Sequence, residues 1–205
     1  MRYVETILWS LGFTLLLIFF GTQVWGEIER QRGIAAFSDM PQLPIMNQAI
    51  PASLSVSESK EAPPATELLE PSGDAVLALL RIADIRLELP VRYGTDERVL
   101  RRGPGLIEGS PFPGSNGNVA IAAHRDLHFR GLKDLELGDL IELEVPDHTQ
   151  TYIITDLSVV EPSDVHVLDE IGQPALTLVT CYPFYFVGNA PERFIVRAEA
   201  AEFFH

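Results

Sequence analysis

Residues 177–181 read Thr-Leu-Val-Thr-Cys, a run of β-branched and apolar residues that ends in the only cysteine of this 205-residue chain. Such residues favour a strand, and Tyr182-Pro183 directly afterwards limits how far the strand extends. Cys181 is therefore expected at the end of a strand. A lone thiol forms no internal disulfide and makes a poor zinc site without a second soft ligand. These five residues leave open a cysteine that fills a core gap, an intermolecular linker or a reactive nucleophile.

A second strand end carries a histidine. Residues 118–123 (Asn-Val-Ala-Ile-Ala-Ala) form an apolar stretch that also predicts a strand, and His124 follows it at the start of a polar turn. An imidazole, with an ordinary pKa of about 6.5, can exchange a proton with a thiol, whose ordinary pKa is about 8.5. Nucleophilic catalysis by cysteine needs such a partner. His124 therefore favours the nucleophile among the three interpretations of Cys181.

An arginine completes the set of candidate catalytic residues. Arg193 lies in another apolar run, twelve residues after Cys181. Its guanidinium is a permanent cation with a planar fork of donors, which suits an oxyanion or a substrate carbonyl. Arg197 is its rival, because residues four apart on a strand share a face.

These segments resemble the sortases, the cysteine transpeptidases of bacterial cell surfaces. Residues 177–181 match the Thr-Leu-x-Thr-Cys strand of that family, residues 123–126 (Ala-His-Arg-Asp) match its histidine turn, and residues 192–196 match its arginine strand. The family pattern selects Arg193 over Arg197. The continuation Cys-Tyr-Pro-Phe is most like the class D sortases and related proteins of Gram-negative bacteria.

The resemblance continues upstream and covers about residues 78–200. Residues 100–105 (Leu-Arg-Arg-Gly-Pro-Gly) and 113–118 (Pro-Gly-Ser-Asn-Gly-Asn) look like the family's glycine-rich approach to the histidine strand. The resemblance implies a sortase-like closed β-barrel, a secreted protein substrate that carries a sorting motif, and an amine acceptor from the cell wall or another protein. We expect no cofactor and no metal, since the calcium-binding acidic loops of some sortases have no counterpart here.

The resemblance also implies a role for each site residue. Cys181 would attack a backbone carbonyl of the sorting motif and form a thioacyl enzyme. His124 would protonate the departing amine and then accept a proton from the incoming one, while Arg193 would hold the motif's carbonyls and the oxyanion. Thr180 is expected beside the thiol in the substrate pocket. Asp126 could orient His124, and His128 could shape the entrance of the site.

Two other functions remain open from the sequence. A cell-surface cysteine peptidase would use water as the acceptor, with the same thioacyl intermediate. A non-catalytic barrel would bind surface peptides without cleaving them, although all three reactive positions are present. Nucleic acid is excluded as a partner, because the net charge of −14 opposes phosphate binding.

The amino-terminal segment predicts a membrane anchor. Residues 6–26 contain no charged side chain and include the strongly apolar run 15–20. These 21 residues suffice for one membrane-spanning helix. A cleaved signal peptide is the alternative, but its apolar core would be shorter and no small-x-small cleavage site follows Trp25. Arg2 lies before the segment and Arg30 and Arg32 follow it, so charge does not decide the orientation. The family resemblance implies a single-pass protein of the bacterial cytoplasmic membrane, with the catalytic domain outside the cytoplasm.

The remaining chain predicts a linker followed by an all-β domain. Residues 27–37 predict a short amphipathic stub. Residues 38–74 contain six prolines among many serines and alanines, which is typical of an extended tether. Together these two segments, residues 27–74, form the predicted linker. Residues 75–205 form the predicted domain, because short runs of alternating residues separated by glycine and proline indicate a barrel or sandwich. Strands are expected within residues 81–89 (broken at Pro90), 139–145, 151–154, 175–180 and 194–198, with short helical pieces at residues 132–135 and 163–171.

Overall fold

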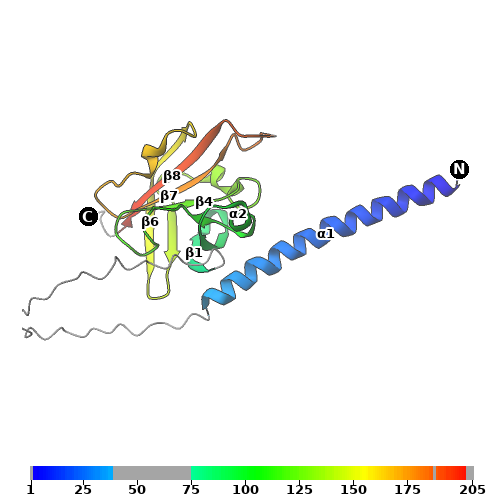
Figure 1. The fold of residues 1–205 in the computed structure, drawn as a ribbon, viewed down its shortest axis with the longest axis horizontal. Coiled ribbons are helices and arrows are strands. Elements are labelled where there is room, and N and C mark those ends of the chain that lie inside the picture. Colours follow the sequence, from blue (N-terminus) through cyan, green and yellow to red (C-terminus); the bar gives the residue numbers. More distant parts are fainter. Residues whose placement is uncertain (1, 39–74, 187, 202–205) are drawn as a thin grey trace, which may run out of the picture.

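A computed structural model describes residues 2–38, 75–186 and 188–201, and shows a closed β-barrel with one long helix leading away from it (Figure 1). The strand order around the barrel is β1-β2-β3-β4-β7-β8-β6-β5. The strands are β1 (Val76–Ile82), β2 (Leu87–Tyr93), β3 (Gly105–Leu106), β4 (Asn118–Ala122), β5 (Leu140–Glu144), β6 (Thr149–Val160), β7 (Ala175–Tyr182) and β8 (Glu192–Ala200). The helices are α1 (Arg2–Ser38) and α2 (Glu97–Arg102), with 3₁₀ turns η1 (Ala83–Ile85), η2 (Arg130–Asp134) and η3 (Val165–Leu168). The predicted all-β fold with a closed barrel is confirmed.

The pairing of three strands matters most for the site. β4 and β7 are adjacent and parallel, and their first residues, Asn118 and Ala175, pair directly although they are 57 positions apart in the sequence. β7 and β8 are adjacent and antiparallel. The carboxyl ends of β4 and β7 therefore meet the amino end of β8 at one edge of the barrel.

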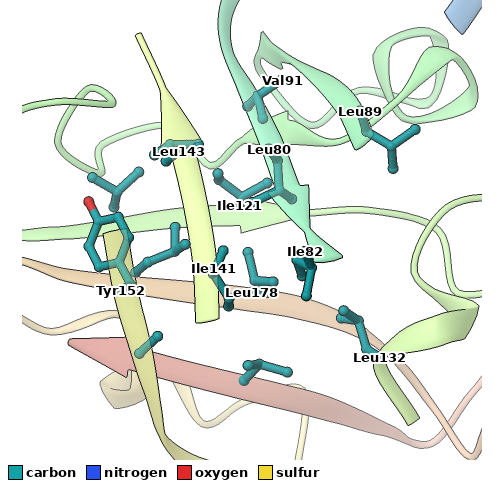
Figure 2. Packing of buried hydrophobic residues seen from close by; sticks show 14 of the residues in the cluster. Leu80, Ile82, Leu89, Val91, Ile121, Leu132, Ile141, Leu143, Tyr152 and Leu178 are labelled. Atoms are coloured by element: carbon teal, nitrogen blue, oxygen red, sulfur yellow. The ribbon is translucent and has the colours of Figure 1, made fainter. Parts of the chain in front are cut away.

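Apolar side chains from all sides fill the barrel (Figure 2). Alternate residues of each strand point inward, as the period-two pattern requires. The one polar atom in the labelled set, the Tyr152 hydroxyl, donates a hydrogen bond to Gln150 Oε1 at 2.7 Å. Ten residues labelled in Figure 2 illustrate this core: Leu80, Ile82, Leu89, Val91, Ile121, Leu132, Ile141, Leu143, Tyr152 and Leu178.

The strands predicted within residues 81–89 are the end of β1 and the start of β2, joined by a 3₁₀ turn, and the predicted break at Pro90 is wrong. The chain turns at η1, after which Arg86 adopts a left-handed conformation with φ of 52°. Pro90 lies inside β2, opposite Leu79 of β1. On its other side β2 pairs with β3 only from Arg92 onward. No strand therefore lies beside Pro90 on that side, and the missing backbone N–H of proline breaks no hydrogen bond there.

The short helical elements also differ from the prediction. Of residues 163–171 only η3 is helical, and the piece at residues 132–135 corresponds to η2. The sequence pattern missed α2, whose amino end is capped by Asp96: Oδ1 accepts hydrogen bonds from Arg98 N at 2.8 Å and Val99 N at 3.0 Å. A helix of six residues is too short to show a helical period.

The carboxyl-terminal end of α1 packs on the barrel beside β1 and β2. Phe37 is buried against Val76 and Leu79, and Arg30 Nη1 donates to Glu88 O at 3.4 Å. At Gly33 the helix comes so close to β2 that an added Cβ would lie 2.6 Å from Pro90 Cγ. The helix is thus anchored to the barrel at one end, whereas the rest of it leads away (Figure 1).

The predicted membrane span at residues 6–26 falls within α1, and the side chains of residues 11–20 are exposed. Within residues 2–38, 75–186 and 188–201, no helix is long and apolar enough to cross a membrane. The predicted tether lies outside the described residues, apart from Ser38 at the end of α1.

Candidate active site

His124, Cys181 and Arg193 lie next to one another across three strands. β4 and β7 pair in register up to Ala122 and Val179, and Ala123 N then donates to Val179 O at 3.2 Å. Extending this register by two residues brings His124 beside Cys181. On the other side Cys181 is the direct cross-strand partner of Arg193. The structure therefore brings together the three predicted catalytic residues.

The alternation of each strand puts these side chains on the outer face. Leu176 and Leu178 of β7 point into the core, so Cys181 points outward. Its thiol is free and half-buried. A cysteine that only filled a core gap would lie among the inward residues, and this position instead leaves the sulfur within reach of a substrate.

The turn that carries His124 is well fixed. The backbone N–H groups of His128 and Phe129 both donate to His124 O, at 3.0 and 3.1 Å. The ring Nε2 lies 3.3 Å from Glu97 Oε2 of α2, and 32% of the His124 side chain is exposed. Sequence reasoning missed Glu97, which lies 27 residues before His124 on a helix that the pattern did not predict.

Arg193 and Arg197 share the outer face of β8 but have different partners. Nη1 of Arg193 donates to Glu192 O at 2.9 Å and to Ala190 O at 3.3 Å, one and three residues before it in the chain. Nη2 of Arg197 donates instead to Val167 O of η3. Arg197 lies opposite Thr177, four residues before the thiol. Only Arg193 is therefore at the level of Cys181.

Thr180 occupies the inner face. It is 2% exposed, and its hydroxyl donates to Ala123 O at 2.8 Å. This bond ties β7 to the residue before His124. Because consecutive strand residues point to opposite faces, Thr180 does not line the surface on which Cys181 is exposed. The predicted place of Thr180 in a substrate pocket is not supported by this position.

A second arginine near the thiol was not predicted as a site residue. Arg125 is 6% exposed, and its guanidinium donates to Asp126 Oδ1 at 3.1 Å and to Asp126 Oδ2 at 2.6 Å. It also donates to Pro183 O and, at 2.8 Å, to Phe186 O. The hydrogen bonds with Arg125 lower the pKa of Asp126. Asp126 thus pairs with Arg125, its neighbour in the histidine turn.

Aromatic side chains surround the start of the β7–β8 connection. Tyr182 and Phe194 stack with ring centres 6.2 Å apart, and Phe184 packs edge-on against Phe194 at 5.1 Å. Tyr185 is 75% exposed, with the Arg130 guanidinium 5.5 Å from its ring centre. The thiol is therefore followed by a buried aromatic cluster and then by an exposed aromatic residue.

His128 joins the histidine turn to α2. Its Nε2 lies 3.4 Å from Arg101 O, and burial lowers the pKa of His128. His148 and His166 are exposed beside Asp147 and Asp164, and His205 lies outside the described residues. No function was predicted for these last three histidines.

Comparison with known proteins identifies relatives over the same region. Residues 80–201 match the sortase domain family. Sortase D of Bacillus subtilis (strain 168) is 36% identical over 128 residues, which cover 62% of this chain and 65% of that protein. Sortase A of Streptococcus agalactiae serotype III (strain NEM316) is 32% identical over 133 residues, which cover 60% of this chain and 52% of that protein. The chain therefore spans less than two thirds of the length of these relatives.

Solved structures agree with this similarity. A Clostridium perfringens Sortase D5 transpeptidase matches with a TM-score of 0.57 and 30% identity, over 63% of this chain and 81% of that chain. Clostridium perfringens sortase C, solved with the C-terminal cell wall sorting motif, matches with a TM-score of 0.60 and 30% identity, over 65% and 74% of the two chains.

Proposed function

The chain belongs to the sortase family, among whose classes it is most like class D, and from this premise we propose that it is a cysteine transpeptidase that processes secreted proteins. The observation that carries the proposal is the meeting of β4, β7 and β8. Their ends bring a histidine, a free thiol and an arginine together on an accessible face. This set supplies a nucleophile, a proton donor and acceptor, and a cation for a developing oxyanion.

In the first step the Cys181 thiolate attacks the backbone carbonyl carbon of a sorting motif. A carbon–sulfur bond forms, and the carbonyl oxygen takes up the negative charge of the tetrahedral intermediate. When the intermediate collapses, the peptide C–N bond breaks and His124 as imidazolium gives its proton to the departing amine. The products are a thioacyl enzyme, a free amine and a neutral imidazole.

In the second step an incoming amine attacks the thioester carbon. His124 as neutral imidazole accepts the proton that the amine loses, a new C–N bond forms, and the carbon–sulfur bond breaks to return the thiolate. The imidazolium and thiolate of the starting enzyme are thereby restored. Glu97 Oε2 lies 3.3 Å from Nε2 of the His124 ring and can hold that ring in place through both steps.

Arg193 is proposed to hold the substrate carbonyls and the oxyanion. In the free enzyme its Nη1 donates to Ala190 O and Glu192 O, so the guanidinium must exchange these bonds for substrate oxygens when the motif binds. A single donor to an oxyanion contributes roughly 3 kcal/mol to the stability of the transition state. The cross-strand pairing with Cys181 gives Arg193 the short reach that this role needs.

The nature of the acceptor can be tested through the products. The full chain is incubated with a degenerate mixture of peptides in the presence and absence of hydroxylamine, and the products are identified by mass spectrometry. Transpeptidation predicts peptide hydroxamates cleaved at one preferred sequence, formed faster than free acids. Free acids alone, at the same rate with and without hydroxylamine, would show a peptidase that uses water. Binding without either product would show a non-catalytic barrel.

Membrane attachment through residues 6–26, with the barrel outside the cytoplasm, is the second part of the proposal. It is supported by the absence of charged residues in this segment and by large exposed apolar side chains, including Phe13, Phe19 and Phe20. Cell fractionation with amino-terminal sequencing tests it. We expect an intact amino terminus in the membrane fraction, whereas a soluble mature chain that begins near Ala36 would contradict retention of the anchor.

A further inference from the structure

The chain directly after Cys181 is held to the histidine turn by one buried side chain, that of Arg125. Its guanidinium donates to Pro183 O, two residues after the thiol, and to Phe186 O, five residues after it. Arg125 is itself the neighbour of His124 in the chain. One residue therefore connects the segment that follows the thiol to the turn that carries the imidazole.

The charge of Arg125 is also directed toward the thiol. The side chain of Arg125 is 7% exposed, whereas that of its partner Asp126 is 56% exposed. Water screens the carboxylate far more than the guanidinium, so the pair leaves a positive potential on its protein side. Hydrogen bonds to Asp126 are the main cause of the raised pKa of Arg125. Because Nη1 of Arg125 donates to Pro183 O, two residues after Cys181, the guanidinium and the sulfur are within electrostatic reach of each other.

Arg125 differs from Arg193 in what it can contact. Arg193 lies on the outer face beside the thiol and is exposed enough to exchange its bonds for a substrate. Arg125 is buried, and two of its partners are backbone carbonyls of the chain that follows Cys181. It therefore acts on the reaction through Cys181 and not through direct contact with the substrate.

We propose that Arg125 is a positioning residue, which fastens the segment after Cys181 to the histidine turn and stabilises the thiolate with its buried positive charge. The inference rests on the proposed function, in which that thiolate is the nucleophile. It adds a second cation to the site, one that supports the resting enzyme while Arg193 serves the transition state.

The test measures the reactivity of the thiol itself and needs no peptide. Iodoacetamide reacts with the thiolate in one displacement, in which a carbon–sulfur bond forms and iodide leaves. Because Cys181 is the only cysteine, total labelling of the full chain reports on this residue alone. The second-order rate constant at pH 7 is compared among the wild type, Arg125→Gln, Arg125→Lys and Arg197→Gln. Arg197 is the matched control, since its guanidinium also bonds a backbone carbonyl beside the same sheet.

We expect Arg125→Gln to slow alkylation about tenfold, as expected for loss of one opposite charge near a titrating group. Arg125→Lys keeps the charge and should recover most of the rate, while Arg197→Gln should alkylate like the wild type. An unchanged rate in a folded Arg125→Gln protein would overturn the proposal. A loss in Arg125→Lys as large as that in Arg125→Gln would overturn the role of the charge.

A fourth variant, Asp126→Asn, decides the question if Arg125→Gln does not fold. Asp126 is exposed, so its substitution perturbs packing little, and it leaves the Arg125 charge uncompensated. Alkylation should become several-fold faster while the melting temperature stays that of the wild type, which separates this effect from exposure of the thiol by unfolding. An unchanged or slower rate would contradict the proposal. Failure of the proposed function has a different signature, since no peptide would then be processed whatever the alkylation rates.

Discussion

On the outer face of β7 and β8, two pairs of polar side chains lie four residues apart along the strands. Each pair, together with its neighbour on or just beyond β4, forms one level of the sheet, and the two levels differ in how accessible their side chains are. At the first level Ala120, Thr177 and Arg197 lie side by side. At the second level His124 lies beyond the end of β4, next to the direct pair Cys181 and Arg193. Both levels have an arginine on β8 opposite a polar residue on β7.

The first level is closed. Thr177 Oγ1 donates to Asn118 Oδ1 at 2.7 Å, and both residues are fully buried. Asn118 Nδ2 donates to the carbonyls of Val167 and Asp169 at 3.3 and 3.2 Å, and Arg197 also donates to Val167 O. The η3 segment thus covers this level and satisfies its buried polar groups.

The second level is open. His124, Cys181 and Arg193 are all half-buried, and Arg193 bonds only carbonyls next to it in the chain among the contacts of the described residues. The comparison shows that an arginine beside a polar strand residue does not define a site. What distinguishes the second level is that its reactive groups remain accessible to an external ligand.

The largest effect is expected at the open level, for Cys181→Ala. Loss of the nucleophile should abolish peptide processing, because no other thiol exists to form the thioacyl enzyme. A half-buried thiol at a strand end contributes little packing, so the melting temperature should stay close to that of the wild type. Turnover by this variant at the wild-type rate would exclude Cys181 as the nucleophile.

The two arginines separate the levels most sharply. Arg193→Lys loses the planar fork and should lower kcat/KM by about 10²-fold or more. Arg197→Lys, the matched change at the closed level, should be nearly silent in activity. Steady-state kinetics of both variants on the same peptide provides the comparison. If Arg197→Lys is instead the impaired enzyme, Arg197 and not Arg193 is the oxyanion donor.

At the closed level the expected effect is on stability. Thr177→Val removes the donor to Asn118 Oδ1 and leaves that oxygen buried without this partner, which costs about 1–3 kcal/mol. Denaturant unfolding measures the change. Thr149→Val, at an exposed position of β6, serves as the control and should change stability by less than about 0.5 kcal/mol. Equal stability of the two variants would contradict the closed network.

The smallest effect is expected from His128, which borders the open level. Burial lowers its pKa in the folded state, so the unfolded state binds more protons as the pH falls below the ordinary value of about 6.5. Its contribution is fully present above that value and is lost as the pH falls through the lower folded pKa.

The measurement is the melting temperature between pH 7.5 and 5. His128→Gln should lose less stability over this range than the wild type, by less than about 1 kcal/mol. The control His166→Gln, at a side chain that is 69% exposed, should follow the wild type. Identical pH dependence in His128→Gln and the wild type would show that the burial of His128 has no energetic consequence.

The residues of the second level could be predicted from the sequence, because each lies in a local pattern. Strand ends that carry Cys181 and His124 are visible locally, since β-branched runs end at a proline or a polar turn. The motif resemblance then linked them to Arg193. The register that joins these residues is a property of the closed barrel. The alternation of apolar residues was enough to predict β4 to β8, but not the bounds of β1 and β2 or the two-residue strand β3.

Contacts between distant segments could not be predicted in the same way. Glu97 belongs to a helix too short to show a period, and the bonds of Arg125 to the Pro183 and Phe186 carbonyls depend on backbone geometry. Pro90 was predicted to end a strand, but β2 continues through it. One side of β2 has no strand partner at Pro90 because β3 is short, and the sequence does not show this. Thr180 was placed beside the thiol by proximity in sequence, whereas alternation puts it on the opposite face.

The central claim, that the open level performs covalent catalysis through Cys181, is tested most directly by intact-mass analysis of the acid-quenched reaction. We expect the wild type to gain the mass of the acyl part of a cleaved peptide, and fragmentation to locate that mass on Cys181. Hydroxylamine should remove it, as expected for a thioester, and Cys181→Ala should show no such gain. Product formation without any adduct at Cys181, or an adduct that persists in Cys181→Ala, would contradict the claim.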